Sequence, residues 1–581
     1  MSCTTILVGK KASYDGSTII ARDDDSGSGR YDPKKFIAVA PQDQPRHYRS
    51  VLSHVEIDLP DNPCRYSIVP NVLPNRGILA EAGVNEHNVA MSATETIAVN
   101  ERVLAADPLV ELQPANEAAD TPEIPGGIGE EDIITLVLPY VTTAREGVAR
   151  LAELLETYGT YESNGIIISD VNEIWYVETI GGHHWIARRV PDDCYATIPN
   201  QLGIDDFDFD DAFSTQREFM CSADLREFMD AHHLDRTMSA GASSGFGFQP
   251  TSVFGNASMN GGGNSSSGAA LGHNHFNPRT AFGTATTKDR IYNTPRAWYM
   301  QRHLNPSEDW DSPAARYTPA SDDIPWCRVP ENAVTLEDVD FLMSAHFEGT
   351  PYDPYGTLGT PESRHRYRPI GINRTGHMVA MQIRPYAPEA SRSIMWISYG
   401  SGPFTAATPF YANVDDTPAY LRDTTPEVST GNLCRGRGDC GKRKYCNYRK
   451  TAAVQRRNGG IFAHSRYETA QRRALHVQQS HAQQFRHVRP LELSIKPRNS
   501  AKPVPMSQGF RARSIPHERR LLEASVLLPT ASRLHPHPRT SVFAHISLIY
   551  GRFQELTRGI SLIYMALVLV GKAISGVKYT L

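Results

Sequence analysis

The sequence predicts an α+β fold with antiparallel sheets over residues 3–427. Three short β-rich runs, 165–169, 174–177 and 185–187, follow one another across tight turns. One long amphipathic helix, 144–158, precedes these runs. Strand runs that are joined by turns and separated by helices are typical of layered α+β folds with antiparallel sheets.

The first element is a predicted β-hairpin. Residues 4–8 and 17–21 are β-rich, and Asp15-Gly16 between them is a turn signal. A second strand region lies within 77–96, where the apolar residues around Val89 alternate with small or polar ones. These segments predict strands at the start of the domain.

The helix 144–158 has sequence signals at both ends. Thr143 and Glu146 fit a capping box at its start, and Gly159 supplies a stop. Its apolar residues recur at helical spacing and define one buried face. Further helices are predicted at 212–231 and 295–303, and further strands at 378–383 and 394–399.

Composition divides the 581-residue chain into two unlike parts. The net charge of −5 hides a basic segment from residue 431 onward, with about 27 Lys+Arg against about 6 Asp+Glu. We therefore expect one domain over 3–427, interrupted by a Gly/Ser/Asn-rich flexible insertion at 239–274. The basic tail, 430–581, shows no persistent helix or strand pattern.

The basic tail has the charge of a nucleic-acid-binding segment but none of its other features. No aromatic residues are interleaved with the basic ones in a stacking pattern, and Cys434, Cys440 and Cys446 lack the close Cys-x-x-Cys spacing of a zinc site. We interpret the tail as frame-shifted or disordered, and expect no nucleic-acid partner. Resequencing the transcript across 427–434 tests this; a confirmed in-frame tail contradicts it.

Several sequence features favour a cytoplasmic protein that needs no cofactor or metal. The 8 cysteines are sparse, as in a reducing compartment, and the N-terminus lacks the pattern of a signal peptide. The apolar run 561–570 is too short for a membrane span. No phosphate-binding loop or HExxH metal motif occurs, and His183-His184 at a strand start is more typical of ordinary packing.

Cys3 at the start of the first predicted strand is the candidate nucleophile. If the residues before it are removed, Cys3 carries both a thiol and a free α-amine, whose reference pKa of about 7.7–8.0 suits a general base. A nearby guanidinium would favour the thiolate, and a carboxylate could hold the α-amine. Arg22 and Asp25, on the returning strand, are the candidates for these two roles.

Several long phrases resemble the N-terminal-nucleophile cysteine dipeptidases, the PepD-like family to which secernins are related. They include CTTILVGKKASYDGSTIIARDDD at the start, GVNEHNVAMSATET at 83–96, NGIIISDVNEIWYVETIGGHHWIARRVPDD at 164–193 and YNTPRAWYMQRHLNP at 292–306. The resemblance implies an αββα sandwich and hydrolysis of dipeptides with broad specificity, without a metal. It also places the nucleophile at Cys3.

A wider resemblance, to penicillin V acylases and bile-salt hydrolases, implies further site residues. Their Cys followed by Arg-x-x-Asp matches Cys3, Arg22 and Asp25. Their later Asn, which helps to form the oxyanion hole, resembles Asn200, and their later active-site Arg resembles Arg296. They have a further Asn at the position near Thr94, where this chain has Thr.

Two residues precede Cys3, and this leaves alternatives open. Removal of Met1 exposes Ser2, so a second cleavage is needed to expose Cys3; Ser2 as the nucleophile is a weaker alternative, since the family motif begins with Cys. The rival functions are an amidase acting on other small amides and a non-catalytic, secernin-like protein. We expect dipeptide substrates and no membrane partner. The sequence leaves open whether the chain forms a homo-oligomer.

Overall fold

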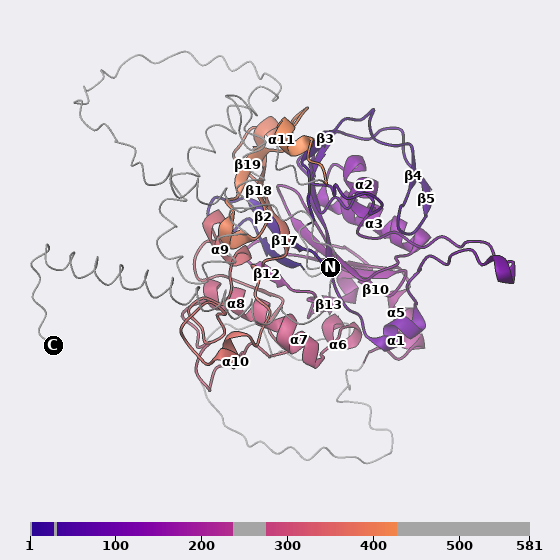
Figure 1. Cartoon of the computed structure of the whole chain (residues 1–581). Coiled ribbons are helices and arrows are strands. Elements are labelled where there is room, and N and C mark those ends of the chain that lie inside the picture. The colour runs from indigo at the N-terminus through magenta and orange to yellow at the C-terminus, as the bar shows by residue number, and fades with distance from the viewer. Residues whose placement is uncertain (1–2, 28–31, 236–274, 427–581) are drawn as a thin grey trace, which may run out of the picture. The chain divides into compact units, whose positions relative to one another are not determined.

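The computed structural model describes residues 3–27, 32–235 and 275–426 (Figure 1). The expected insertion at 239–274 and the expected tail at 430–581 lie outside the described residues. No helix in the described ranges has both the length and the apolar character that crossing a membrane requires.

The first of two large sheets has seven strands and contains the N-terminal hairpin at its centre. Its order is β16-β12-β1-β2-β17-β18-β19, and every neighbouring pair is antiparallel. The strands are β1 (Thr4–Val8), β2 (Thr18–Asp25), β12 (Tyr195–Ile198), β16 (Cys327–Arg328), β17 (Thr375–Ile383), β18 (Ser393–Tyr399) and β19 (Thr408–Tyr411).

The second large sheet has eight strands, in the order β14-β11-β10-β9-β8-β7-β6-β3, again with antiparallel neighbours. Its strands are β3 (Ile37–Val39), β6 (Tyr66–Ile68), β7 (Ala82–Asn85), β8 (Ala90–Thr96), β9 (Asn164–Ser169), β10 (Ile174–Ile180), β11 (His184–Arg189) and β14 (Phe219–Cys221). Two small sheets pair β4 (His47–Arg49) with β5 (Glu56–Asp58) and β13 (Phe207–Asp208) with β15 (His275–Phe276).

Short helices accompany the sheets. They are α1 (Glu101–Ala106), α2 (Ile133–Val137), α3 (Ala144–Tyr158), α4 (Phe209–Ala212), α5 (Leu225–Ala231), α6 (Pro278–Phe282), α7 (Thr287–Tyr292), α8 (Thr294–Leu304), α9 (Leu336–Met343), α10 (Pro361–Arg364) and α11 (Ala419–Arg422). Single 3₁₀ turns are η1 (Glu117–Ala119), η2 (Leu138–Tyr140), η3 (Glu389–Ser391) and η4 (Gly402–Phe404). The α+β class with antiparallel sheets is confirmed.

Side chains that alternate along the strands pack into three separate buried clusters. Leu7 of β1 packs in one cluster with Tyr176 of β10, so this cluster joins one face of each large sheet. Ile6, the neighbour of Leu7, points to the opposite face and packs in a second cluster with Trp298 of α8. A third cluster joins the other face of the eight-stranded sheet to α2 and α3. The large sheets therefore have apolar contacts on both faces.

Helix α3 occupies the range that the sequence predicts, but its capping differs in one detail. The Thr143 side chain accepts a hydrogen bond from the Glu146 backbone N–H, as expected. The Glu146 carboxylate, however, accepts from the backbone N–H of Thr142 at 2.7 Å rather than from that of Thr143. Gly159 ends the helix with a φ of 67°, a conformation that glycine adopts without strain.

The predicted helix 212–231 is wrong over its first two thirds and is confirmed only at its end. Helix α4 ends at Ala212, strand β14 follows, and α5 forms the last part of the predicted range. The Asp211 carboxylate accepts from the backbone N–H groups of Glu218 and Phe219, at 2.8 and 2.9 Å, and so satisfies donors that a helix would have used. Pairing of β14 with β11 then extends the eight-stranded sheet. The predicted helix at 295–303 is confirmed as α8, and the predicted strands are also present.

We expect Leu151→Ala to destabilise the fold, because Leu151 is fully buried between α3 and the eight-stranded sheet. Truncation of such a side chain usually lowers the free energy of unfolding by about 2–5 kcal/mol. Glu153→Ala, at an exposed position of the same helix, is the matched control. Denaturant unfolding measures both, and equal midpoints for the two variants would contradict the packing described.

Candidate active site

The register of the N-terminal hairpin places Arg22 beside Cys3. Thr5 of β1 pairs with Arg22 of β2, and side chains two residues apart on a strand share a face. Cys3, two residues before Thr5, therefore points to the same side as Arg22. The Arg22 Nη2 lies 2.9 Å from the Cys3 Sγ, and both side chains are buried.

Two carboxylates hold the guanidinium of Arg22. Its Nη2 lies 3.0 Å from Glu81 and 3.0 Å from Glu130, and its Nη1 donates to the carbonyl of Ala93. Glu81 directly precedes β7, and Glu130 lies in the turn before α2. Burial alone would lower the pKa of Arg22, but Cys3 and the two carboxylates raise it well above its usual value. Arg22 is therefore a fixed positive charge at the thiol.

A second buried cation, Lys34, extends this network. Its Nζ lies 3.0 Å from Glu81 and 3.3 Å from Asp24, and it donates to the Leu79 carbonyl. The Nδ1 of His377, in β17, lies 3.2 Å from the same Asp24 oxygen, Oδ2. Burial opposes ionisation of Asp24, yet Lys34 and His377 hold its pKa well below the usual value. Burial lowers the pKa of His377.

Asp25 lies on the opposite face of β2 from Arg22, since the two are three residues apart on a strand. Its carboxylate pairs with Arg368 and accepts a hydrogen bond from the Thr375 hydroxyl at 2.6 Å. Burial raises the pKa of Asp25, and Arg368 opposes that rise. Arg368 also donates to the Thr4 hydroxyl at 3.1 Å, so Asp25 is linked to the start of β1 through an arginine.

Arg296 links Asn200 to the backbone of Cys3. The Arg296 Nη1 donates to the Cys3 carbonyl and, at 2.7 Å, to the Thr4 hydroxyl, while Nη2 donates to the Asn200 Oδ1 at 2.9 Å. The Asn200 Nδ2 donates to the Thr96 carbonyl at 2.9 Å. Helix α8 supplies Arg296, and the segment after β12 supplies Asn200.

The position near Thr94, named above from the wider resemblance, lies in strand β8. Its pairing with β9 is irregular between Ala93 and Glu95. The carbonyls of Ala93 and Thr96, on either side of the irregularity, accept from Arg22 and Asn200 respectively. The irregular stretch of β8 therefore presents one backbone carbonyl to Arg22 and another to Asn200.

The five residues singled out from the sequence thus lie in one network, but they contact the thiol differently. Arg22 contacts the thiol directly, and Arg296 contacts the Cys3 carbonyl. Asn200 contacts Arg296, whereas Asp25 contacts Arg368.

Sequence reasoning gave no role to six buried ionisable residues of this network: Asp24, Lys34, Glu81, Glu130, Arg368 and His377. A signal existed for one of them, because Glu81 interrupts the apolar stretch ILAEAG at 78–83. A carboxylate inside such a stretch is buried only with a partner.

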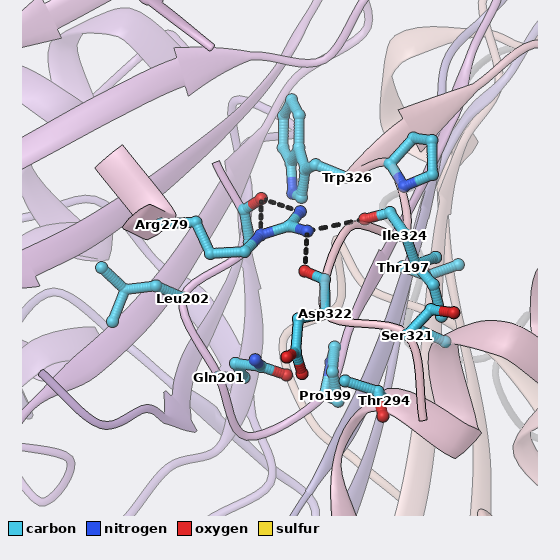
Figure 2. Close-up of a pocket in the computed structure, with 13 residues that line it drawn as sticks. Thr197, Pro199, Gln201, Leu202, Arg279, Thr294, Ser321, Asp322, Ile324 and Trp326 are labelled. Atoms are coloured by element: carbon cyan, nitrogen blue, oxygen red, sulfur yellow. Dashed lines mark hydrogen bonds between the residues drawn. The ribbon is translucent and has the colours of Figure 1, made fainter. Parts of the chain in front are cut away.

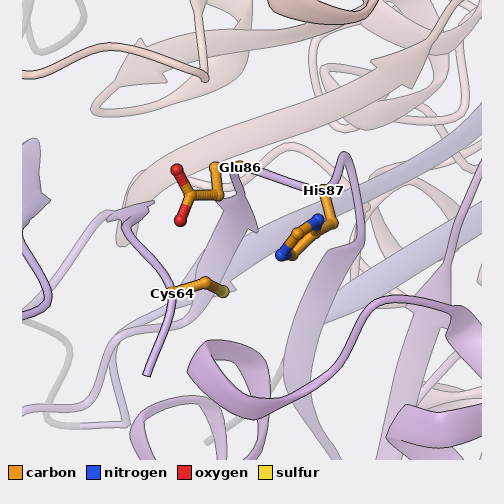
Figure 3. A group of neighbouring side chains, drawn as sticks. All are labelled: Cys64, Glu86 and His87. Atoms are coloured by element: carbon orange, nitrogen blue, oxygen red, sulfur yellow. The ribbon is translucent and has the colours of Figure 1, made fainter. Parts of the chain in front are cut away.

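A group of possible metal ligands lies elsewhere, next to strands β6 and β7 (Figure 3). In the described part of the chain, ligand atoms of Cys64, Glu86 and His87 lie within 4.8 Å of one another. Burial, with a contribution from Glu86, raises the pKa of the Cys64 thiol to about 12, which disfavours the thiolate that metals bind. Glu86 already accepts from the Arg65 backbone N–H at 3.1 Å. These contacts and the raised pKa of the thiol therefore give little support for a metal at this group.

The adjacent histidines 183 and 184 have a simpler explanation. Their Nδ1 atoms lie 3.0 and 2.7 Å from the two oxygens of Asp107, which also accepts both of their backbone N–H groups. Asp107, with its pKa lowered by these hydrogen bonds against the effect of burial, fixes the turn into β11.

A small pocket lies beside the segment that carries Asn200 (Figure 2). Its lining includes Pro199 and Gln201 from this segment and Thr294 from α8. Arg279 crosses it and donates to the carbonyls of Gly203 and Ile324, at 3.2 and 2.6 Å. The Arg279 side chain thus occupies part of this pocket.

Comparisons of the chain with a family model and with known proteins agree with one another. The sequence model of peptidase family C69 matches residues 2–435 and so ends close to the start of the basic tail. The chain is 57% identical to a dipeptidase of Bifidobacterium longum over 434 residues, which are 74% of this chain and 75% of that protein. It is 52% identical to a probable dipeptidase A of Streptococcus pyogenes, over 74% of this chain and 79% of that protein. Identity to a probable dipeptidase B of Lactococcus lactis is 44%, with the same two coverages.

We expect Arg22→Gln to raise the pKa of the Cys3 thiol. Loss of a cation 2.9 Å from sulfur removes an interaction that favours the thiolate, and such contacts shift a pKa by about 1–3 units. Alkylation of Cys3 at pH 7 should therefore slow about tenfold or more, as followed by mass spectrometry of the Cys3 peptide. Arg49→Gln, which removes an exposed ion pair with Glu56, is the control. Equal alkylation rates for wild type and Arg22→Gln would contradict the electrostatic role.

Proposed function

The chain belongs to peptidase family C69, and we propose that it is a cysteine dipeptidase that uses Cys3 as its nucleophile. The observation that carries the proposal is the contact between the Cys3 Sγ and the Arg22 guanidinium, inside a buried charged network. A buried thiol in apolar surroundings would be inert, whereas a thiol against a fixed cation is favoured as the reactive thiolate.

The general base in this proposal is the α-amine of Cys3, exposed by removal of Met1 and Ser2. Its reference pKa of about 7.7–8.0 lies near neutral pH, so it can accept the thiol proton. Arg296, which donates to the Cys3 carbonyl and the Thr4 hydroxyl, fixes the backbone that carries the amine. Asp25 supports the same turn of backbone through Arg368 and Thr4.

The reaction then proceeds in two displacement steps. The thiolate attacks the peptide carbonyl carbon, a C–S bond forms, and the α-ammonium gives its proton to the leaving amino group as the C–N bond breaks. Water next attacks the thioester and releases the second amino acid and the thiol. Asn200 and a backbone N–H stabilise the oxyanion, a type of contact often worth about 3 kcal/mol.

The fold and the thiols fit this proposal. Two antiparallel sheets with apolar contacts on both faces support the αββα N-terminal-nucleophile sandwich. The five cysteines in the described ranges are all free thiols, as suits a cytoplasmic enzyme.

We expect the mature enzyme to begin at Cys3 and Cys3→Ala to reduce dipeptide turnover to background, since Cys3 supplies the thiol that contacts Arg22 in the described residues. N-terminal sequencing and intact mass test the processing, and a dipeptide assay tests the variant. Cys221→Ala, at a buried thiol whose pKa burial raises to about 12, should remain active. Turnover by folded Cys3→Ala would rule out this nucleophile.

A substrate panel separates the dipeptidase from its rival functions. We expect hydrolysis of several unmodified dipeptides, with acylated amino acids and bile-salt conjugates turned over at least tenfold more slowly in kcat/KM. The reverse preference would indicate an amidase of the acylase type. A chain that begins with Cys3 and hydrolyses none of these substrates would indicate a non-catalytic protein.

A further inference from the structure

Asn293 is a buried side chain at the junction of α7 and α8, and it contacts both Asn200 and Arg296. Its Nδ2 donates to the backbone carbonyl of Asn200 at 2.9 Å and to the Asp289 Oδ1 at 2.7 Å. Its Oδ1 accepts from the Arg296 Nη2 at 2.9 Å. Since Arg296 donates in turn to the Cys3 carbonyl, one side chain separates Asn293 from the proposed nucleophile.

The neighbours of Asn293 allow only one orientation of its amide. A guanidinium donates and never accepts, so the atom that faces Arg296 is the oxygen, Oδ1. A carboxylate and a backbone carbonyl accept, so the atom that faces Asp289 and Asn200 is Nδ2. A flipped amide would place an oxygen against two acceptors and an N–H against a donor. The position is therefore specific for asparagine, because aspartate of the same shape lacks both N–H donors.

The guanidinium of Arg296 has acceptors at all three of its nitrogens. Nε donates to the Tyr292 carbonyl at 2.9 Å, and Nη1 donates to the Cys3 carbonyl. Nη2 donates to the Oδ1 atoms of Asn200 and Asn293, each at 2.9 Å. Loss of the Asn293 side chain would leave Arg296 with its other contacts, so we expect Arg296 to keep its place at the Cys3 backbone.

Asn200 is held at both its backbone and its side chain. It follows β12 in a segment without helix or strand, so no regular ladder of hydrogen bonds holds its carbonyl. The Asn293 Nδ2 donates to that carbonyl instead. In the side chain, Oδ1 accepts from Arg296, and Nδ2 donates to the Thr96 carbonyl at 2.9 Å. Since the oxygen faces Arg296, Nδ2 is the edge of the amide that can donate to an oxyanion.

Asp289 makes the position of Asn293 rigid. It is 4% exposed and belongs to the capping box at the start of α7. Its Oδ2 accepts from the Thr286 backbone N–H at 2.8 Å and from the Thr284 hydroxyl at 2.9 Å, while its Oδ1 accepts from Asn293. The side chain that holds Asn293 is thus itself fixed by a helix cap.

We propose that Asn293 is a positioning residue that directs the Asn200 amide toward the oxyanion. It holds the Asn200 carbonyl directly and the Asn200 Oδ1 through Arg296, so it constrains both the backbone and the side chain of that residue. An oxyanion donor must lie within hydrogen-bond distance of the developing charge, and a shift of about 1 Å can lower the rate about 10²-fold. This inference rests on the proposed function, in which Asn200 stabilises the oxyanion.

The test compares kcat, KM and Cys3 alkylation in variants of the mature full-length protein. For Asn293→Ala we expect kcat for dipeptides to fall about 10–100-fold with KM within about threefold of wild type, because the lost contact acts in the transition state. Alkylation of Cys3 by iodoacetamide forms no oxyanion, so its rate should stay within about twofold of wild type. Asn200→Ala should show the same pattern, with a loss of about 10²–10³ in kcat. Wild-type kcat in Asn293→Ala, or a parallel fall in its alkylation, would overturn the proposal.

Asn305→Ala is the matched control, because Asn305 is a buried asparagine at the other end of α8. Its Nδ2 donates to the Val329 carbonyl at 2.9 Å, and its Oδ1 accepts from the Tyr195 hydroxyl at 2.6 Å. We expect kcat of this variant to equal that of the wild type. Equal losses of kcat in Asn305→Ala and Asn293→Ala would indicate a general effect on the packing of α8 and would contradict a specific role of Asn293.

Two further variants test whether Asn293 acts through Asn200. In the Asn200→Ala background, Asn293→Ala should lower kcat by at most about twofold, because the group that it positions is absent; an undiminished loss would contradict the proposal. Asn293→Asp keeps nearly the same shape and is the variant to use if Asn293→Ala does not fold. It retains an acceptor for Arg296 but no donor to the Asn200 carbonyl, so kcat should fall, and wild-type kcat would refute the positioning role.

Failure of the dipeptidase function and failure of the Asn293 assignment give different results. A wild-type protein that hydrolyses no dipeptide would overturn the dipeptidase function and, with it, the role of Asn293. An active wild type with an equally active Asn293→Ala variant would overturn the role of Asn293 alone.

Discussion

The contact between Arg22 and the Cys3 thiol is the interaction on which the rest of the site depends. A guanidinium with no access to water is stable only when its donors are satisfied and its charge is balanced. Glu81 and Glu130 supply that balance, and Lys34 and Asp24 in turn supply it for Glu81. Holding Arg22 beside the thiol therefore involves charged side chains from four separate stretches of the chain.

The sheets make this arrangement rigid. β2 lies between β1 and β17, so Arg22 and Asp24 project from a strand that is hydrogen-bonded on both sides. Leu7 and Ile6 anchor β1 in different apolar clusters on its two faces. A shift of one residue in the hairpin register would move Arg22 to the face now occupied by Asp25, away from the thiol. The position of Arg22 is thus fixed by the same pairing that forms the core.

The two faces of β2 have separate tasks. On one face, Arg22 contacts the sulfur of Cys3. On the other, Asp25 holds Arg368, which with Arg296 fixes Thr4 and the Cys3 carbonyl. The Arg-x-x-Asp spacing is informative for this reason: an odd separation on a strand places the two residues on opposite faces, one toward the thiol and one toward the backbone that carries it.

The sequence by itself determined the local elements and the family. The hairpin, α3, α8 and the β9–β11 strands follow from short-range periodicity and turn residues. The long family phrases single out Cys3, Arg22 and Asp25 as candidate site residues. Local patterns failed at 213–224, where hydrogen bonds to Asp211 and pairing with β11 outweigh helix propensity. Only the tertiary structure decided that Glu81, Glu130 and Lys34 surround Arg22, because the partners of a buried charge are set by long-range packing and leave no periodic signal in the sequence.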